Sequence, residues 1–94
     1  MQDENIVPFL LRLKHPTLLT RDADFFERRL IHPRYCLAWL DVDPGQTAFF
    51  IRRFLAHPLF RTNAQRMGKV ICIAPRGMEY WTKNEDRMVR ARWL

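Results

Sequence analysis

The sequence predicts an α+β fold, a single small domain (residues 1–94) of three to four short helices with a C-terminal β-hairpin. Three observations support this class. The chain has 94 residues, enough for one hydrophobic core but not for two. Residues 44–56 carry apolar side chains at helical spacing. Residues 69–74 form an apolar, β-branched run, and a Pro–Arg–Gly turn separates it from a second apolar run, which is the pattern of a hairpin.

The first third of the chain predicts little regular structure. Residues 1–5 are expected to be disordered, because chain ends are loose unless packing holds them. Two prolines then bracket an apolar run that is too short for a helix to be assigned. Residues 22–31 predict a short helix, since Asp22 or Asp24 can cap its start and Pro33 closes it.

Residues 34–42 fit either a buried strand or a buried helix. Six consecutive apolar residues begin at Tyr35, and periodicity cannot distinguish the two structures in so short a run. The aromatic and β-branched residues favour a strand, whereas leucine and alanine favour a helix. Pro33 suits the first turn of a helix, so the balance favours a helix here.

The helix over 44–56 has clear start signals, with Asp43 as N-cap and Pro44 at the first helical position. Three residues are expected to be buried in the core by this helix: Ile51, Phe54 and Leu55. Residues 63–67 predict one further helical turn, which Gly68 stops. Residues 84–94 predict a final helix, since apolar residues recur at helical intervals after a possible cap.

In the predicted hairpin, residues 69–74 pair with 78–82, and Arg76 lies at the tip of the turn. Lys69 and Lys83 stand at its outer ends. This arrangement resembles the wing of a winged helix-turn-helix domain, and the resemblance implies DNA binding. Because the segment before the hairpin is short for a recognition helix, either the helix 44–56 reads the DNA or no helix does. The resemblance is topological, and no sequence motif accompanies it.

Arginine is concentrated in the second half of the chain. Thirteen of the sixteen basic residues are Arg. Up to Gly45 there are six basic and seven acidic residues, whereas from Gln46 onward there are ten basic and three acidic residues. Clustered positive charge attracts polyanions, and the planar guanidinium group binds phosphate bidentately. The sequence therefore predicts a non-enzymatic nucleic-acid-binding domain, with DNA favoured over RNA.

The candidate contacts include Phe49, which falls among arginines on the polar side of its helix, where it could stack on a base. The alternative for this ring is burial under another element. The residues predicted to bind nucleic acid or a partner are Phe49, Arg52, Arg53, Arg76, Arg87 and Arg90. Arg and Trp are also enriched at protein interfaces, so the alternative function is a protein–protein adaptor or inhibitor that binds an acidic surface.

No catalytic or metal site is predicted, and a small nuclease is the least favoured hypothesis. Each histidine precedes a proline, which places it at an element boundary for a backbone reason. The sequence contains no Cys-x-x-Cys or His-x-x-x-His pair and no phosphate-binding glycine loop, so no metal or cofactor is expected. The carboxylates of Asp41 and Asp43 lack a catalytic partner set.

The remaining sequence features indicate a cytoplasmic protein with no membrane contact. No apolar run is long enough to cross a bilayer, and the acidic first residues do not resemble a secretory signal. Cys36 and Cys72 both lie in apolar runs and are expected to be buried free thiols of a reducing compartment, with a single long-range disulfide as the alternative. The oligomeric state cannot be predicted.

Overall fold

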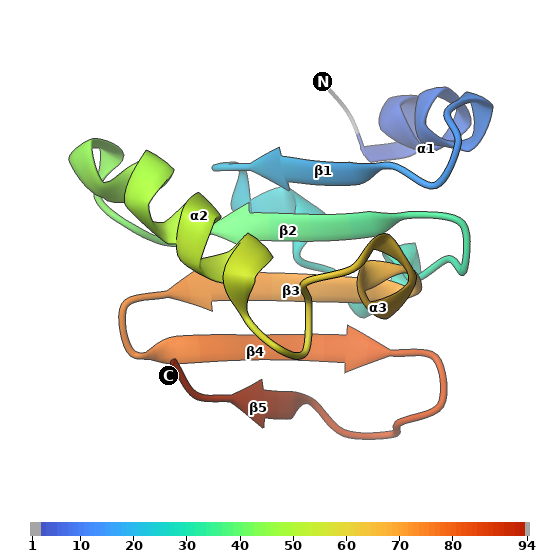
Figure 1. Ribbon diagram of the computed structural model, residues 1–94. Coiled ribbons are helices and arrows are strands. Elements are labelled where there is room, and N and C mark those ends of the chain that lie inside the picture. The colour runs from blue at the N-terminus through green and yellow to red at the C-terminus, as the bar shows by residue number, and fades with distance from the viewer. Residues whose placement is uncertain (1–2, 94) are drawn as a thin grey trace.

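A five-stranded mixed sheet forms the centre of the computed structural model, which describes residues 3–93 (Figure 1). The strands follow the chain order across the sheet. The first three strands are parallel, and each of the last two is antiparallel to the strand before it. The strands are β1 (Thr17–Thr20), β2 (Cys36–Leu40), β3 (Lys69–Ala74), β4 (Gly77–Thr82) and β5 (Val89–Ala91).

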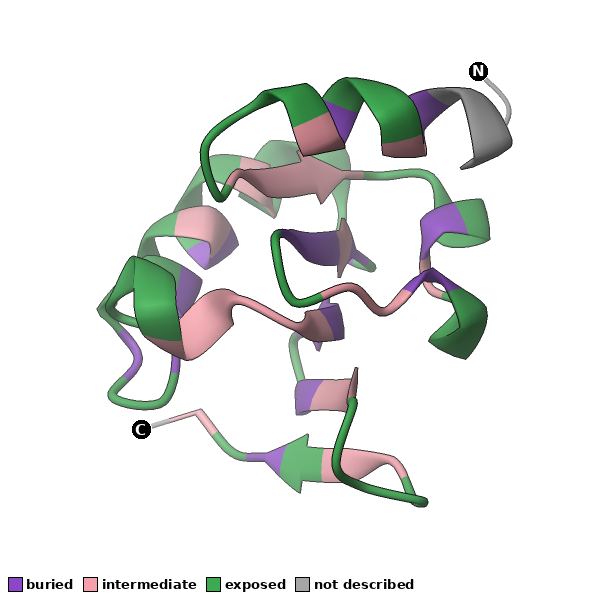
Figure 2. Cartoon of the chain, turned by 90° about the vertical axis from the view of Figure 1, so that its right-hand side faces the viewer, coloured by how far each residue is buried: buried purple, intermediate pink, exposed green. Residues whose placement is uncertain are grey.

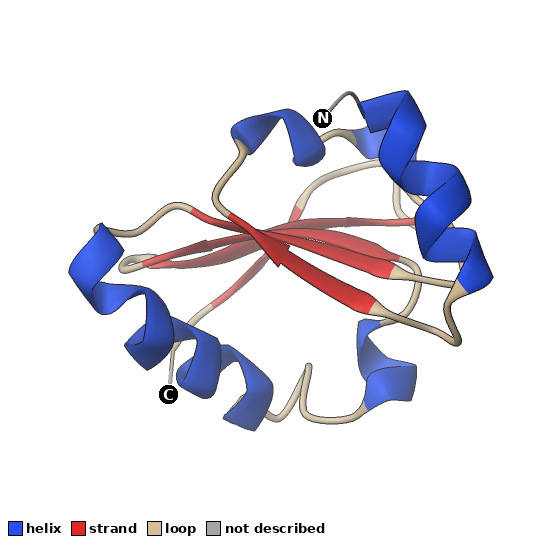
Figure 3. Ribbon diagram, turned by 90° about the horizontal axis from the view of Figure 1, so that it is seen from above, coloured by secondary structure: helices blue, strands red, loops and turns tan. Residues whose placement is uncertain are grey.

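Helical segments cover both faces of the sheet (Figure 3). One face, which we call the α2 face, carries the segment that connects β2 to β3. It contains the 3-10 turn η3 (Pro44–Gln46) and the helices α2 (Thr47–Ala56) and α3 (Asn63–Arg66). The opposite α1 face carries the helix α1 (Asp3–Arg12) and the 3-10 turns η1 (Ala23–Phe25) and η2 (Arg28–Leu30).

The two parallel crossovers have opposite hands. The β1–β2 connection passes over the α1 face and the β2–β3 connection over the α2 face, while the strand order advances in one direction (Figure 1). The β2–β3 crossover is the left-handed one, which is the rare hand for such units. As a consequence, residues 44–68 form a layer of their own on the α2 face.

Two hydrophobic clusters, one on each face, form the core, and Figure 2 shows the buried residues gathered in and around the strands. Strand β2 contributes to both. Cys36, Ala38 and Leu40 pack in the α2-face cluster, whereas Leu37 packs in the α1-face cluster. Side chains of a strand alternate between the faces, so both faces of β2 need apolar residues.

The predicted fold, three to four short helices with a C-terminal β-hairpin, is wrong, because the structure has more strand and less helix than expected. The sheet dominates the domain, and within residues 3–93 only α1 and α2 are helices of ten residues. The predicted hairpin is not a wing, because β3 is an inner strand and β4 also pairs with β5. The resemblance to a winged helix-turn-helix domain is therefore wrong as well.

The expected helix over 34–42 is wrong, because this segment contains β2. Its six apolar residues reflect a strand buried between two layers, which needs no alternation of apolar and polar positions. The expected helix over 84–94 is also wrong. There β5 pairs with β4, placing Val89 opposite Tyr80 and Ala91 opposite Met78. This pairing satisfies backbone groups of β4 that would otherwise lack partners, and it outweighs a weak helical pattern.

The expected helix over 22–31 is replaced by η1 and η2, which extended backbone at Glu27 separates. Phe25 and Leu30 are both buried, and this break lets them reach the core although their spacing is not helical. The Asp22 cap is confirmed, since its Oδ1 accepts a hydrogen bond of 2.9 Å from the Asp24 N–H. At the start of the chain, α1 begins at Asp3, and residues 1–2 of the expected disordered segment lie outside the described residues.

Several local predictions are confirmed. The 69–74 and 78–82 runs pair as predicted, and a capped turn occupies 63–66. The 44–56 helix forms with Pro44 at its start, and it ends where Pro58 holds His57 in an extended conformation. Phe54 is fully buried, but Leu55 is 38% exposed, so its predicted burial is wrong. Only Phe50 and Phe54, four residues apart, are buried from α2.

Candidate nucleic-acid interface

The layer on the α2 face carries positive charge without negative charge. Residues 44–68, which form it, contain four arginines and no Asp or Glu. The connection between β2 and β3 also contains Asp41 and Asp43, but both precede this layer. The other long connections carry acidic residues as well, for example Asp22 and Asp24 between β1 and β2 and Glu85 and Asp86 between β4 and β5. The arginines of residues 44–68 are therefore not interrupted by carboxylates along the chain.

Two of the four arginines in this layer are available to a ligand. Arg52 and Arg61 are exposed, and within the described residues no carboxylate lies at ion-pair distance from either. Arg66 has a structural role instead. Its Nε donates to the Thr17 hydroxyl at 3.0 Å, and its Nη1 donates to the Phe60 carbonyl at 2.8 Å. These bonds tie the layer to β1, so Arg66 is not available.

Arg53 forms the centre of an aromatic cluster. Its guanidinium carbon lies 4.5 Å from the ring centroid of Trp93, 5.5 Å from that of Phe49 and 5.7 Å from that of Phe50. Phe49 is 49% exposed, so it is neither buried under another element nor turned wholly to solvent. The predicted residues Phe49, Arg52 and Arg53 thus lie together on α2.

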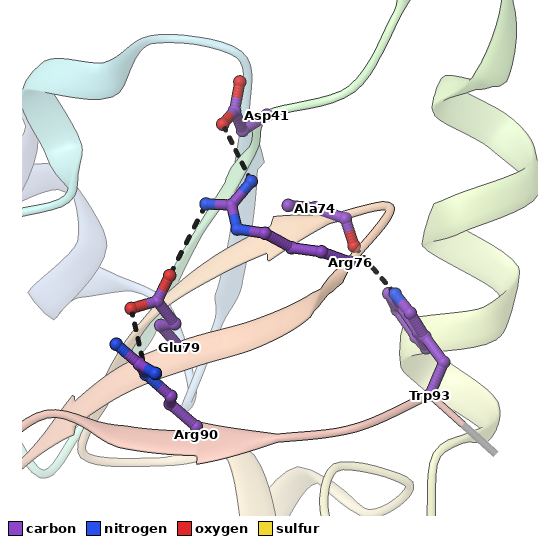
Figure 4. A network of polar contacts seen from close by, with 6 residues as sticks. All are labelled: Asp41, Ala74, Arg76, Glu79, Arg90 and Trp93. Carbon is purple, nitrogen blue, oxygen red and sulfur yellow. Dashed lines mark hydrogen bonds and ion pairs between the residues drawn. The ribbon is translucent and has the colours of Figure 1, made fainter.

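Hydrogen bonds fix the segment after β5 beside α2. The Trp93 indole N–H donates to the Ala74 carbonyl at 2.7 Å (Figure 4). His57 Nδ1 accepts from the Leu59 backbone N–H at 3.1 Å, so Nε2 carries the proton and donates to the Arg92 carbonyl at 2.7 Å. Both ring nitrogens of His57 are therefore engaged, and the residue has a structural role.

An open pocket of about 190 Å³ lies where α2 meets this terminal segment. It is lined by Arg53, Ala56, His57, Pro58 and Trp93. Its walls combine an indole ring, small apolar groups and a guanidinium group. Such a lining suits a flat, apolar group that carries or adjoins negative charge.

Arg76 and Arg90 are engaged in a network with carboxylates (Figure 4). The Arg76 guanidinium lies 4.0 Å from Asp41 Oδ2 and 3.4 Å from Glu79 Oε1, and Arg90 Nε lies 3.7 Å from Glu79 Oε2. Two arginines thus face two carboxylates. Glu79 also borders a larger open pocket of about 480 Å³ between β4 and β5, so an anion there would meet a carboxylate as well as arginine.

The six predicted contact residues therefore do not form one group. Glu79 pairs across the strands with Cys72, which places its side chain and the network on the α1 face, away from the residues of α2. Arg87 is exposed in the connection after β4, at the other end of that strand from the Arg76 turn (Figure 1). The sequence interpretation expected the five arginines of this set to lie on one side, because it took 84–94 for a helix.

Arg61 and Trp93 were missed as candidate contact residues. A signal for Arg61 was present in the sequence, because no acidic residue occurs between Asp43 and Glu79. The position of Trp93 depends on long-range contacts with α2 and the β3–β4 turn, which leave no local signal.

The comparisons do not assign the chain to a family. No protein-family model matches it, and neither a curated protein nor a solved structure shows significant similarity. Within residues 3–93, no group of three or more His, Cys, Asp or Glu side chains is placed to hold a metal ion. Over the same residues, no helix combines the length and apolar character needed to span a membrane.

Proposed function

We propose that this protein is a non-enzymatic nucleic-acid-binding domain whose contact surface is the layer of residues 44–68 with the adjoining segment of Arg92 and Trp93. The observation that carries the proposal is the acid-free composition of this layer together with the exposed guanidinium groups of Arg52 and Arg61, which form no ion pair with the part of the chain that the structure describes. An anion that binds there displaces no carboxylate.

Phosphate binding at this surface gains free energy from the release of counterions, and each guanidinium group can form two parallel hydrogen bonds to a phosphate. Arg76 and Arg90 are poorer candidates, because a phosphate would have to compete with Asp41 and Glu79. The preference for DNA over RNA came from the winged-helix resemblance, which is wrong. The proposal therefore covers both nucleic acids.

A specific observation favours the alternative of a protein partner. Leu55 and Leu59 are 38% and 49% exposed and lie in the same layer as Arg52. Exposed apolar residues beside arginine are common at protein interfaces. An acidic partner protein is therefore the second candidate, and the binding experiment below separates the two.

A cytoplasmic location fits either partner. Cys36 and Cys72 are free and buried, which is the usual state of cysteine in a reducing compartment.

The experiment measures fluorescence anisotropy of labelled single-stranded DNA, RNA and duplex DNA over a range of salt concentrations. Two double variants are compared, Arg52→Ala/Arg61→Ala and Arg76→Ala/Arg90→Ala, which remove the same total charge. Each phosphate contact contributes about one unit to the slope of log K against log salt. We expect the first pair to lower this slope by about two units and the second pair to leave it nearly unchanged.

Equal losses from the two pairs would show that net charge alone, and not this surface, determines binding. Negligible affinity of the unmodified protein for all three nucleic acids would reject the proposed function. In that case, a partner protein whose binding is abolished by Arg52→Glu would support the alternative.

A further inference from the structure

We infer that the preferred ligand is single-stranded nucleic acid, of which one unpaired base stacks on Phe49 and a second enters the pocket formed by Arg53, Ala56, His57, Pro58 and Trp93. This inference rests on the proposed function and specifies the form of its ligand.

The first support is the exposure of Phe49. Its ring makes an edge contact with Phe50, with centroids 5.1 Å apart, and it lies beside the Arg53 guanidinium, yet 49% of the residue is exposed. A duplex presents phosphates and groove edges, and its paired bases leave no flat face open to such a ring. An unpaired base offers its π face, and stacking on aromatic side chains is how many single-strand-binding proteins hold bases.

The second support is the composition of the pocket. The Trp93 indole is held in place by its bond to the Ala74 carbonyl, and Pro58 and Ala56 add small apolar surfaces. The Arg53 guanidinium already lies over the indole ring at 4.5 Å, so a base could continue this stack. Both nitrogens of His57 are occupied, which leaves the pocket few groups that could distinguish one base from another. Weak sequence preference is therefore expected.

The third support is the spacing of the two sites. Phe49 and Ala56 are seven residues apart on α2, which corresponds to about 10 Å along the helix axis. A stacked strand advances about 3.4 Å per nucleotide and a stretched strand advances further, so two or three nucleotides span this distance. The free guanidinium groups of Arg52 and Arg61 lie in the same layer and are available to the phosphates.

The test compares three ligands with equal numbers of phosphates: a single-stranded oligonucleotide, an abasic oligonucleotide and a duplex. The abasic strand keeps the charge and removes the bases. We expect the complete single strand to bind at least about tenfold more tightly than either of the others, because stacking of one base contributes between about fivefold and about 150-fold in affinity.

Two variants locate the bases. Phe49→Ala removes the proposed stacking ring, and Ala56→Leu fills the pocket without changing charge. Each is expected to weaken binding of the single strand by about fivefold or more and to leave binding of the abasic strand unchanged. Phe9→Ala is the matched control, because Phe9 is equally exposed, at 52%, but lies on α1. A thermal melt of each variant checks that it is folded.

The outcomes distinguish the inference from the proposed function. Equal binding of all three ligands, or equal losses from Phe49→Ala and Phe9→Ala, would overturn the inference while leaving a phosphate-binding domain. Tighter binding of the duplex would do the same. Failure of all three ligands to bind would reject both.

Discussion

Cys36 and Cys72 show how the position of a single side chain determines its chemistry. They lie on the adjacent strands β2 and β3, but Cys36 faces the α2 face and Cys72 the α1 face, so they remain free thiols. Burial raises the pKa of Cys36 to about 12. Burial also raises the pKa of Cys72 to about 11, helped by the nearby carboxylates of Asp41 and Glu79 and opposed by Arg76. Neither thiol is a candidate nucleophile at neutral pH.

These raised pKa values predict that the domain loses stability in alkali. An unfolded thiol releases its proton near pH 9.0, whereas the buried thiols keep theirs up to about 11 and about 12. Between these values the native state binds more protons than the unfolded state, so a rise in pH favours unfolding. We expect the free energy of unfolding, measured with urea, to be constant near neutrality and to fall as pH rises above about 9.

The double variant Cys36→Ala/Cys72→Ala is the control for this prediction. It should show a smaller decrease, and the remainder reflects other groups such as Tyr35, whose pKa burial also raises. A stability that stays constant or rises in alkali would contradict the assignment of both thiols as buried and neutral.

At the scale of single elements, the sequence predicted what depends on local chemistry. The helix 44–56 followed from a proline and helical spacing, and the 69–82 pairing followed from a turn between two apolar runs. The expected cap did not form, because the Asp43 side chain makes no capping hydrogen bond and residues 44–46 form a 3-10 turn before α2. The strand nature of β2 and β5 depends on neighbours that are distant in sequence. The run from Tyr35 packs against hydrophobic clusters on both faces of the sheet. The residues that pack against it are distant in sequence, so the local sequence could not distinguish a buried strand from a buried helix.

The candidate site was predictable to the same extent. Phe49, Arg52 and Arg53 were found because they lie on one helix. The ion pairs of Arg76 and Arg90 were not foreseen, because they require the β3–β4 and β4–β5 registers that bring Glu79 between the two arginines.

The attachment of β5 to β4 yields a prediction at Gly77. This residue has a φ of +144°, and a Cβ atom there would lie 2.8 Å from the Ala91 carbonyl oxygen. Gly77→Ala would therefore strain the backbone and push β5 away from the start of β4. We expect it to lower the free energy of unfolding by about 1–3 kcal/mol, measured by urea denaturation.

Gly45→Ala is the matched control, because no atom lies within 4 Å of the Cβ position at Gly45 and the residue has no left-handed φ. It should be neutral or slightly stabilising, since alanine restricts the unfolded chain. If both variants lost the same stability, the cause would be the general replacement of glycine and not the close approach of β5.

At the scale of the whole molecule, the two layers that cover the sheet differ in their content of acidic residues. All five acidic residues that precede β2 lie in the part of the chain that covers the α1 face, whereas residues 44–68 of the crossover on the α2 face contain none. The opposite hands of the two crossovers cause this separation, because two connections of the same hand would lie on one face. The acid-free stretch of residues 44–68 thus lies on one face of the sheet.

The same architecture predicts the order in which the domain opens. Strand β3 has partners on both edges and packing on both faces, and Val70, Ile71, Cys72 and Ile73 are at most 3% exposed. Strand β5 pairs with β4 through three residues along one edge, and α1 packs on one side only. Amides with few buried contacts exchange through local opening, whereas those of the central core exchange only on global unfolding.

Measured hydrogen exchange should therefore be slowest in β3 and faster in α1 and β5. Added urea should accelerate exchange chiefly in β3. If β5 were protected as strongly as β3, the terminal strand and the Trp93 segment would belong to the stable core, and the wall of the proposed base pocket would be rigid.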